Sequence, residues 1–275
     1  MHLNHSPLKW AAVMCMAFAG MQACAQPAPA FQPEVGQEGK DVVWVPTSQA
    51  LVNKMLDMAK LTAKDIHYDL GSGDGRTVIT AAKRGARSYG IEYNPEMVTL
   101  AQQAAAKEGV SERGTFAKAD LFETDFSKAT VLTLFLLPTI NEKLKPKILD
   151  MQPGTRVVSN TFTMGDWEAD ETGTAATDQN SSYYRTALLW IVPAKVDGQW
   201  RSATGDFTLK QVYQKFTGSM SGGSVATVIT GGKLNGDQIS FSAGGAQYVG
   251  TVSATGIYGT VTAGGSSKQW SATRP

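Results

Sequence analysis

The segment of residues 69–76 constrains the fold of this chain more than any other. It reads Asp-Leu-Gly-Ser-Gly-Asp-Gly-Arg and lies between an apolar run typical of a strand and a run typical of a helix. Glycines let the backbone turn tightly and approach a ligand closely. The free N–H groups of a helix that opens at Gly75 point at the same place. The segment therefore predicts a strand–turn–helix unit with a ligand at the turn.

Strand-like and helix-like runs alternate from about residue 41 to residue 195. Strands are expected at residues 66–70, 88–92, 115–118, 130–135, 156–161 and 187–192. This alternation predicts an α/β domain at 41–195 with a Rossmann-like, doubly wound, mostly parallel sheet and helices on both faces.

Helix boundaries in this part are marked by capping residues. Thr47 is expected to cap a helix with apolar residues on one face. Thr139 and Glu142 have the spacing of a capping box, which predicts the start of another helix. Pro146 is expected to kink or split that helix.

The composition changes after Lys195. Residues 196–275 hold 15 of the 28 glycines and show no helical periodicity. Short strands are expected at 207–216, 225–230, 238–242, 247–252 and 257–262, and Asn235-Gly236 is typical of a tight hairpin. These features predict a small all-β C-terminal domain, a barrel or a sandwich. A stabilising appendage and a carbohydrate- or envelope-binding module both remain open for it.

The first 40 residues are expected to lie outside the folded domains. Residues 1–25 resemble a secretory signal peptide, because an apolar run too short to span a bilayer ends at Ala23-Cys24-Ala25. Residues 26–40 are expected to form a linker. We therefore expect an exported protein of the periplasm or cell envelope. A lipoprotein form, attached to the membrane through a lipidated Cys24, is the alternative.

Residue counts exclude several functions. Both cysteines, Cys15 and Cys24, fall in the leader, and His67 is the only histidine outside it. No metal site is expected, and zinc hydrolases are excluded. His67 itself is expected to be a packed strand residue. The formal net charge of +1 argues against nucleic acid as the main partner, because phosphate binding needs a concentrated basic surface.

The acids around the glycines favour a ligand without phosphates. Asp69 suits the α-ammonium group of an amino acid, and Glu92, at the end of the next strand, suits ribose hydroxyls. A dinucleotide such as NAD is the alternative, but its sites prefer Gly-x-Gly-x-x-Gly, whereas here the third glycine comes one residue early and follows Asp74. We therefore predict S-adenosyl-L-methionine (SAM). The predicted cofactor-binding residues are Asp69, Gly71, Ser72, Gly73, Gly75, Glu92, Asp120 and Leu121.

The last two members of this set follow the third predicted strand. There Asp120 is expected to accept from the adenine amino group and Leu121 to offer a backbone contact; a surface turn is the alternative.

Residues for the methyl acceptor are expected where the fourth and fifth strands end, since ligands of open α/β sheets lie at the carboxyl ends of strands. The substrate-facing candidates are Leu137, Pro138, Asn160, Phe162 and Trp167. In the alternative interpretation, Phe162 and Trp167 pack into the core. No catalytic base is predicted.

Several segments together resemble the class I, seven-strand SAM-dependent methyltransferases. They are Val45-Pro46-Thr47, residues 69–76, Gly90-Ile91-Glu92-Tyr93-Asn94-Pro95, Asp120-Leu121-Phe122, residues 134–138 and residues 153–159. Within that class the chain is most similar to protein-lysine methyltransferases of the mitochondrial membrane-protein type. The resemblance covers about residues 41–195 and implies SAM contacts at Asp69, Gly71, Gly73, Glu92 and Asp120. The leader and the β-rich tail are not part of that family's core.

The function expected from this resemblance is transfer of a methyl group from SAM to a nitrogen nucleophile, in the first place a protein lysine. A small-molecule methyltransferase is one alternative. The other is a non-catalytic exported envelope protein that retains the fold.

Overall fold

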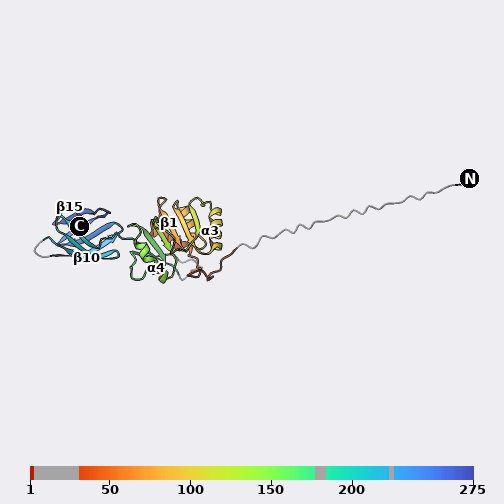
Figure 1. Cartoon of the computed structure of the whole chain (residues 1–275), viewed down its shortest axis with the longest axis horizontal. Helices are drawn as coiled ribbons and strands as arrows, with labels where there is room; N and C mark the ends of the chain where they lie inside the picture. The colour runs from red at the N-terminus through yellow and green to blue at the C-terminus, as the bar shows by residue number, and fades with distance from the viewer. Residues whose placement is uncertain (3–30, 177–183, 223–225) are drawn as a thin grey trace. The chain divides into compact units, whose positions relative to one another are not determined.

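The computed structural model describes residues 1–2, 31–176, 184–222 and 226–275 (Figure 1). The predicted signal peptide, apart from its first two residues, lies outside the described residues, and so does Cys24. Residues Pro33–Pro275 form one compact unit. Within the described ranges, no helix is long and apolar enough to cross a membrane.

A seven-stranded sheet forms the first part of this unit, with the strand order β3-β2-β1-β4-β5-β7-β6. The strands are β1 (Ile66–Leu70), β2 (Arg87–Glu92), β3 (Gly114–Lys118), β4 (Val131–Leu134), β5 (Arg156–Asn160), β6 (Glu171–Thr174) and β7 (Thr186–Ile191). The first five run parallel, whereas β7 is antiparallel to both β5 and β6. The mostly parallel sheet expected from the alternation is confirmed. The edge strand β6 was not predicted, because Glu-Thr-Gly-Thr carries no apolar pattern.

Helices cover the two faces of the sheet: α1 (Gln49–Met58), α2 (Arg76–Lys83), α3 (Pro95–Lys107) and α4 (Pro138–Leu149). Helix α1 packs against the face that carries Val131 and Val158. Helix α4 belongs to the core cluster that holds the alternate residues Leu132 and Val157. Because successive strand residues point to opposite faces, these helices lie on opposite sides of the sheet. Helices α1 and α2 share a small apolar cluster through Val52 and Ala81, which places them on one face.

Two predicted helix starts are wrong by a residue or more. Helix α1 is capped by Ser48, whose hydroxyl accepts a hydrogen bond from the Leu51 N–H. Helix α4 begins at Pro138 with no side-chain cap; proline at the first position has a backbone already set for the helix and no N–H that needs an acceptor. Pro146 does not split α4, which continues to Leu149.

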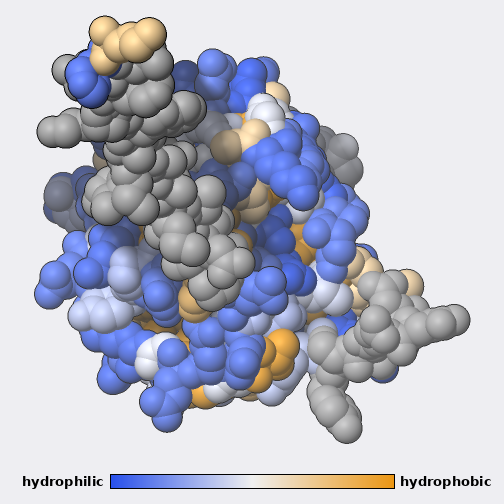
Figure 2. Space-filling view, turned by 90° about the vertical axis from the view of Figure 1, so that its right-hand side faces the viewer, coloured by the Kyte–Doolittle hydropathy of each residue, from blue (hydrophilic) through white to orange (hydrophobic). Residues whose placement is uncertain are grey.

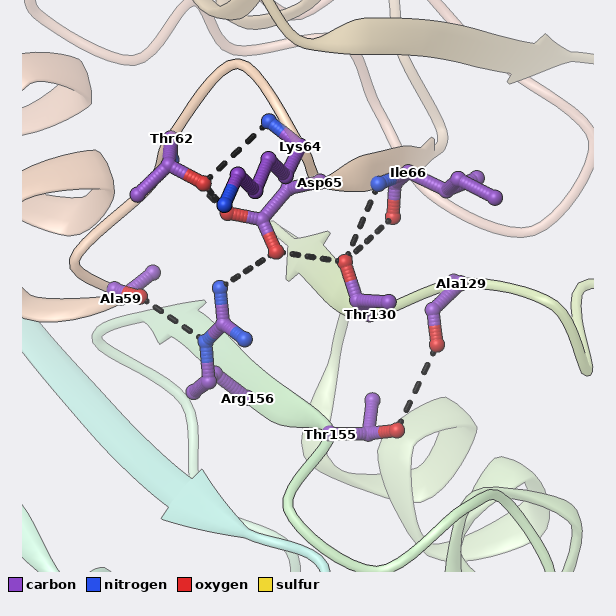
Figure 3. Close-up of polar contacts among 9 residues, drawn as sticks. All are labelled: Ala59, Thr62, Lys64, Asp65, Ile66, Ala129, Thr130, Thr155 and Arg156. Carbon is purple, nitrogen blue, oxygen red and sulfur yellow. Dashed lines mark hydrogen bonds and ion pairs between the residues drawn. The ribbon is translucent and has the colours of Figure 1, made fainter.

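The end of the sheet where the parallel strands begin is held by a partly buried ion pair (Figure 3). Asp65 accepts from the Arg156 guanidinium at 2.7 Å and from the Thr130 hydroxyl at 2.7 Å, and Arg156 also donates to the Ala59 carbonyl. Burial disfavours the charge on Asp65, but these bonds and those from Thr62 outweigh it and lower its pKa. The network ties α1, β1, β4 and β5 together at the end of the sheet opposite the glycine turn.

The C-terminal strands form a closed antiparallel barrel in the order β10-β11-β12-β13-β14-β15-β8-β9. They are β8 (Gly198–Ser202), β9 (Phe207–Val212), β10 (Lys215–Met220), β11 (Thr227–Asn235), β12 (Gln238–Ala243), β13 (Ala246–Val252), β14 (Ile257–Ala263) and β15 (Ser266–Thr273). The predicted hairpin after Asn235 joins β11 to β12. Of the two expected architectures, the barrel is the observed one.

Aromatic side chains fill the barrel. The rings of Phe241 and Tyr248 stack with centroids 4.6 Å apart, and Phe207 and Trp270 approach at 5.7 Å. An eight-stranded barrel is just wide enough for side chains to fill its interior. The inside of this barrel is therefore a packed core.

Trp167 connects the sheet to the barrel. It is 1% exposed, stacks on Tyr213 at 5.8 Å and donates its indole N–H to Gln214 at 2.9 Å. Next to it, Lys215 pairs with Glu168.

The face in Figure 2 is mostly hydrophilic, with only scattered apolar residues.

Candidate functional site

The glycine turn, residues 71–75, joins β1 to α2. Gly71, Gly73 and Gly75 have φ values of 77°, 52° and 80°, which residues with a Cβ rarely adopt. The N–H groups of Gly71 and Ser72 both donate to the Ile91 carbonyl. These bonds fix the turn to the end of β2.

A cavity of about 480 Å³ lies at this turn and along the carboxyl ends of the parallel strands. Most of the predicted site residues line it, namely Asp69, Gly71, Ser72, Gly73, Glu92, Asp120, Leu121, Leu137 and Phe162. Gly75, Pro138, Asn160 and Trp167 are not among the lining residues. The lining residues come from distant parts of the sequence, and the parallel topology requires their side chains to meet at one edge.

Gly75 lies behind the cavity wall, so its predicted place in the cofactor site needs correction. A Cβ at this position would lie 2.6 Å from the Phe116 ring and 2.8 Å from the Ala101 side chain. The glycine is needed for the packing of α2 on α3 and β3.

Three of the substrate-facing candidates, Pro138, Asn160 and Trp167, are not among the residues that line the cavity. Trp167 is in the core, as described above, and Asn160 is fully buried with its amide donating to the Thr47 hydroxyl. Pro138 begins α4, and only its neighbour Leu137 faces the cavity. Of the three, Asn160 supports the cavity wall from behind, because its partner Thr47 is a lining residue.

Glu92 faces the glycine turn. Its carboxylate accepts from the Gly73 N–H at 3.0 Å and from the Asn94 N–H at 2.9 Å. A carboxylate has about four acceptor sites, so about two remain for the hydroxyls of a ribose. The bond to Gly73 also couples the position of this acid to the shape of the turn.

Asp74 is neutralised by its neighbour. Its carboxylate forms a forked ion pair with Arg76, which also donates to the Thr47 carbonyl. The expected repulsion of phosphates by Asp74 is therefore weaker than its charge suggests. The case against a pyrophosphate rests on Asp69 and on the spacing of the three glycines.

Among the carboxyl groups that line the cavity, that of Asp69 has the pKa that departs most from its ordinary value. It is 7% exposed, and burial raises its pKa from 3.8 to about 7. The charges of Asp74 and Glu92 act in the same direction, while a hydrogen bond from the Thr133 hydroxyl, 2.6 Å away, opposes it. A cationic ligand group at Asp69 would stabilise the ionised form.

Asp120 lies at the other end of the cavity, after β3. Its carboxylate pairs with Lys40 and accepts from the Phe122 N–H at 2.9 Å. The hydrogen bond from Lys40 lowers the pKa of Asp120. The Lys40 ammonium also lies 4.8 Å from the centre of the Tyr93 ring.

A strap, defined as residues 37–47, forms one wall of the cavity. Its base is a short loop in which Gly36 donates to the Trp44 carbonyl and Trp44 donates to the Gln37 carbonyl. The Trp44 indole lies so close to the glycine turn that a Cβ on Gly73 would lie 2.6 Å from its nitrogen. Sequence reasoning missed the strap because its first residues fall in the predicted linker, and the apolar run Val42-Val43-Trp44-Val45 carries no motif that indicates a ligand.

Three aromatic rings form the opposite end of the cavity, after β4 and β5 and before β7. Phe135 lies 5.1 Å from Tyr184 and 6.0 Å from Phe162, and Phe162 lies 5.8 Å from Tyr184. Thr161, just before Phe162, has a φ of 62°, a strained conformation for a β-branched residue. This left-handed conformation turns the chain sharply where β5 ends, and the turn places Phe162 in the cavity wall. No sequence signal distinguishes Phe135 from the rest of its apolar run.

The charge of the cavity decides which ligand it accepts. Among the described residues its lining contains six acidic and two basic side chains: Glu38, Asp41, Asp69, Asp74, Glu92 and Asp120 against Lys40 and Arg76. SAM carries an ammonium, a sulfonium and one carboxylate, so its net charge is opposite to that of the cavity. The Ser72 hydroxyl oxygen is buried without a hydrogen-bond partner in the described part of the chain, which leaves it for a polar ligand atom. The residues present fit SAM.

Comparisons with known proteins agree with this geometry. A family model described as the ANTKMT methyltransferase domain matches residues 69–171. A protein-lysine N-methyltransferase of Saccharolobus islandicus is 46% identical over 133 residues, which cover 47% of this chain and 83% of that protein. An adenine nucleotide translocase lysine N-methyltransferase of Mus musculus is 35% identical over 36% of this chain, but the match spans only 44% of that protein.

A solved structure gives the same fold. An RNA methyltransferase of Salinibacter ruber, in complex with S-adenosyl-L-homocysteine, is 43% identical with a TM-score of 0.51, over 55% of this chain and 96% of that one. The sheet order, the cavity chemistry and the identity to these proteins lead to one conclusion. The chain belongs to the protein-lysine N-methyltransferase family of class I methyltransferases, and its cofactor is S-adenosyl-L-methionine.

Proposed function

We propose that this chain methylates the side-chain amino group of a lysine in a protein substrate. The observation that carries the proposal is the cavity, whose lining holds more acidic than basic side chains and which ends, away from Asp69, Glu92 and Asp120, in the rings of Phe135, Phe162 and Tyr184. An acidic wall attracts a cationic side chain, and aromatic faces hold an ammonium group or the hydrocarbon part of a lysine. The lysine methyltransferases named above support the same acceptor.

The order of the strands separates the two ends of the cavity. Asp120, Glu92 and Asp69 belong to β3, β2 and β1 or follow them, while Phe135 and Phe162 follow β4 and β5. The acids therefore bind the adenosine and amino-acid parts of the cofactor on one side of the glycine turn. The aromatic end is left for the acceptor. When bound, SAM supplies an electrophilic methyl group between the two ends.

The acceptor amine must lose its proton before it reacts. At pH 7 a lysine with the ordinary pKa of about 10.4 needs roughly 4–5 kcal/mol to be neutral. The apolar walls formed by Leu136, Leu137 and Phe162 disfavour the charged form and so reduce this cost. Alignment of the amine with the methyl group can supply roughly 7–11 kcal/mol of the barrier. Positioning and desolvation are thus the main contributions of these residues.

RNA is a second candidate acceptor, because the Salinibacter protein is described as an RNA methyltransferase. The acids in the cavity wall disfavour a polyanion, and the chain has a formal net charge of only +1. A small-molecule acceptor is the third candidate. The three candidate acceptors can be distinguished by the kind of molecule that carries the transferred methyl group.

The test is transfer of a radiolabelled methyl group from SAM by the purified full chain at a subsaturating SAM concentration, with Asp69→Asn as the matched control that should transfer less because it binds the cofactor more weakly. Envelope proteins, total RNA and small-molecule fractions are offered separately. Labelled methyl-lysine in digested protein is the expected product. Label that is released by ribonuclease, or that passes a dialysis membrane, would contradict the proposal.

We also propose that the chain is exported to the periplasm or cell envelope, on the basis of residues 1–25. The protein substrates would then be accessible from that compartment. Fractionation of cells that express a C-terminally tagged chain, followed by sequencing of the mature N-terminus, tests this. A start after residue 25 supports a signal peptide, a lipidated Cys24 supports the lipoprotein form, and an intact chain in the cytoplasm excludes both.

A further inference from the structure

Four polar side chains form a row across the middle of the sheet, on the face covered by α1 and α2. They are Ser88 on β2, His67 and Asp69 on β1, and Thr133 on β4, referred to here as the polar row. Ser88, His67 and Thr133 have no exposed surface. Of the four, Asp69 alone lines the cavity. Buried polar groups are costly unless each finds a partner, so their arrangement requires an explanation.

The hydrogen bonds of the polar row run in one direction. When Asp69 is ionised, it accepts the single O–H of Thr133 at 2.6 Å, so the Thr133 oxygen must accept from His67 Nε2, 2.8 Å away. His67 Nδ1 then carries no proton and accepts from the Ser88 hydroxyl at 2.5 Å. The carboxylate of Asp69 therefore fixes the tautomer of an imidazole that it does not touch. Each hydrogen bond in such a chain polarises the next.

The imidazole of His67 stays neutral in this place. Burial lowers its pKa from 6.5 to about 3, although Asp65 acts in the opposite direction. A neutral ring can hand on hydrogen-bond polarisation without bringing a second charge into the core. This distinguishes His67 from a general base, and the residue is not part of the cavity lining.

We propose that His67 is a positioning residue for the cofactor: through Thr133 it orients and supports the Asp69 carboxylate that receives the ammonium group of SAM. This inference rests on the cofactor identity and is independent of the proposed acceptor. The other groups that face Asp69 are Thr77 of α2, the Asp74–Arg76 pair and Glu92. The acids among them repel a charge on Asp69. The polar row offsets part of this repulsion when the carboxyl is ionised.

Binding of S-adenosyl-L-homocysteine to the full chain, measured by calorimetry between pH 5.5 and 7.5, tests the proposal. His67→Phe keeps a ring but removes both nitrogens. It should weaken binding about 3- to 10-fold, the effect of one lost buried hydrogen bond, and move the midpoint of the pH dependence upward. His67→Gln retains a donor toward Thr133 and an acceptor toward Ser88, and should stay within about 2-fold of the unchanged chain. A purely structural role for His67 would leave the pH midpoint in place.

A measurement without any ligand guards against variants that do not fold. In the ¹⁵N spectrum of the unchanged chain, recorded above pH 7 so that Asp69 is ionised, the His67 ring should carry its proton on Nε2, with its signals assigned by their loss in His67→Gln. A proton on Nδ1 would overturn the direction of the polar row. Equal affinity and pH midpoint in His67→Phe and the unchanged chain would overturn the positioning role.

Discussion

Replacement of Asp69 by asparagine should change stability and cofactor binding in opposite directions. In the folded protein the carboxyl has a pKa of about 7, whereas in the unfolded chain it has its ordinary value of 3.8. The folded state therefore holds this proton more tightly, and rising pH destabilises the fold between about pH 4 and pH 7. The full difference of about three pKa units corresponds to about 4 kcal/mol. The change Asp69→Asn removes this penalty, because the amide does not ionise.

The pH dependence of the variant is a sharper quantity than its absolute stability. At pH 5 more than half of the penalty is absent because the folded carboxyl is protonated, and at pH 8 it is nearly complete. The free energy of unfolding of Asp69→Asn, relative to the unchanged chain, should therefore improve by about 2–3 kcal/mol between pH 5 and pH 8. How well the amide fits beside Thr133 adds a constant that does not depend on pH.

Urea denaturation of both chains without ligand, at pH 5 and at pH 8, measures this difference. The same two chains are then titrated with S-adenosyl-L-homocysteine. Loss of a charge-assisted hydrogen bond should weaken binding by about 10- to 100-fold. A stability difference that is the same at both pH values would refute the reasoning about the buried carboxyl. Unchanged ligand affinity would refute the assignment of Asp69 to the ammonium group.

Three further substitutions test other parts of the structure. Gly75→Ala should destabilise the fold by about 2–4 kcal/mol in urea denaturation, because the new Cβ would clash with the Phe116 ring and the φ of 80° disfavours any side chain. Gly109→Ala is the control: its φ of 69° is similar but its Cβ would meet open space, so it should cost about 1 kcal/mol. Trp167→Phe should lower the free energy of unfolding by about 1–3 kcal/mol, because the hydrogen bond from the indole N–H to Gln214 is lost. The affinity for S-adenosyl-L-homocysteine should not change; weaker binding would show that Trp167 contributes to the ligand site. Phe162→Ala should raise the KM for the protein acceptor and leave cofactor affinity within about 2-fold; the reverse pattern in steady-state kinetics would place Phe162 at the cofactor end.

Local sequence signals were sufficient for the parallel sheet and for placing most of the predicted cofactor-binding residues in the cavity lining. The glycine turn, Glu92 and Asp120 each lie at or just after the end of a strand, and the carboxyl ends of parallel strands meet at one edge by topology alone. The position of such residues follows from the strand order alone and does not depend on side-chain packing. This is why they could be placed on the cavity before its shape was known.

The acceptor end depends on packing that a sequence does not display. Asn160 and Trp167 lie in a polar–aromatic stretch that equally suits a binding wall or a core, and the bonds to Thr47 and Gln214 decided for the core. Tyr184 reaches the cavity only because β7 runs antiparallel to β5. Long-range contacts of this kind leave no periodic pattern in the chain.

The most direct test of the account is a calorimetric titration of the purified full chain with S-adenosyl-L-homocysteine and, separately, with NAD. The acidic cavity and the glycine turn predict saturable one-to-one binding of S-adenosyl-L-homocysteine with a micromolar Kd and no binding of NAD. No heat with S-adenosyl-L-homocysteine at high micromolar concentration, or NAD binding of equal strength, would contradict it.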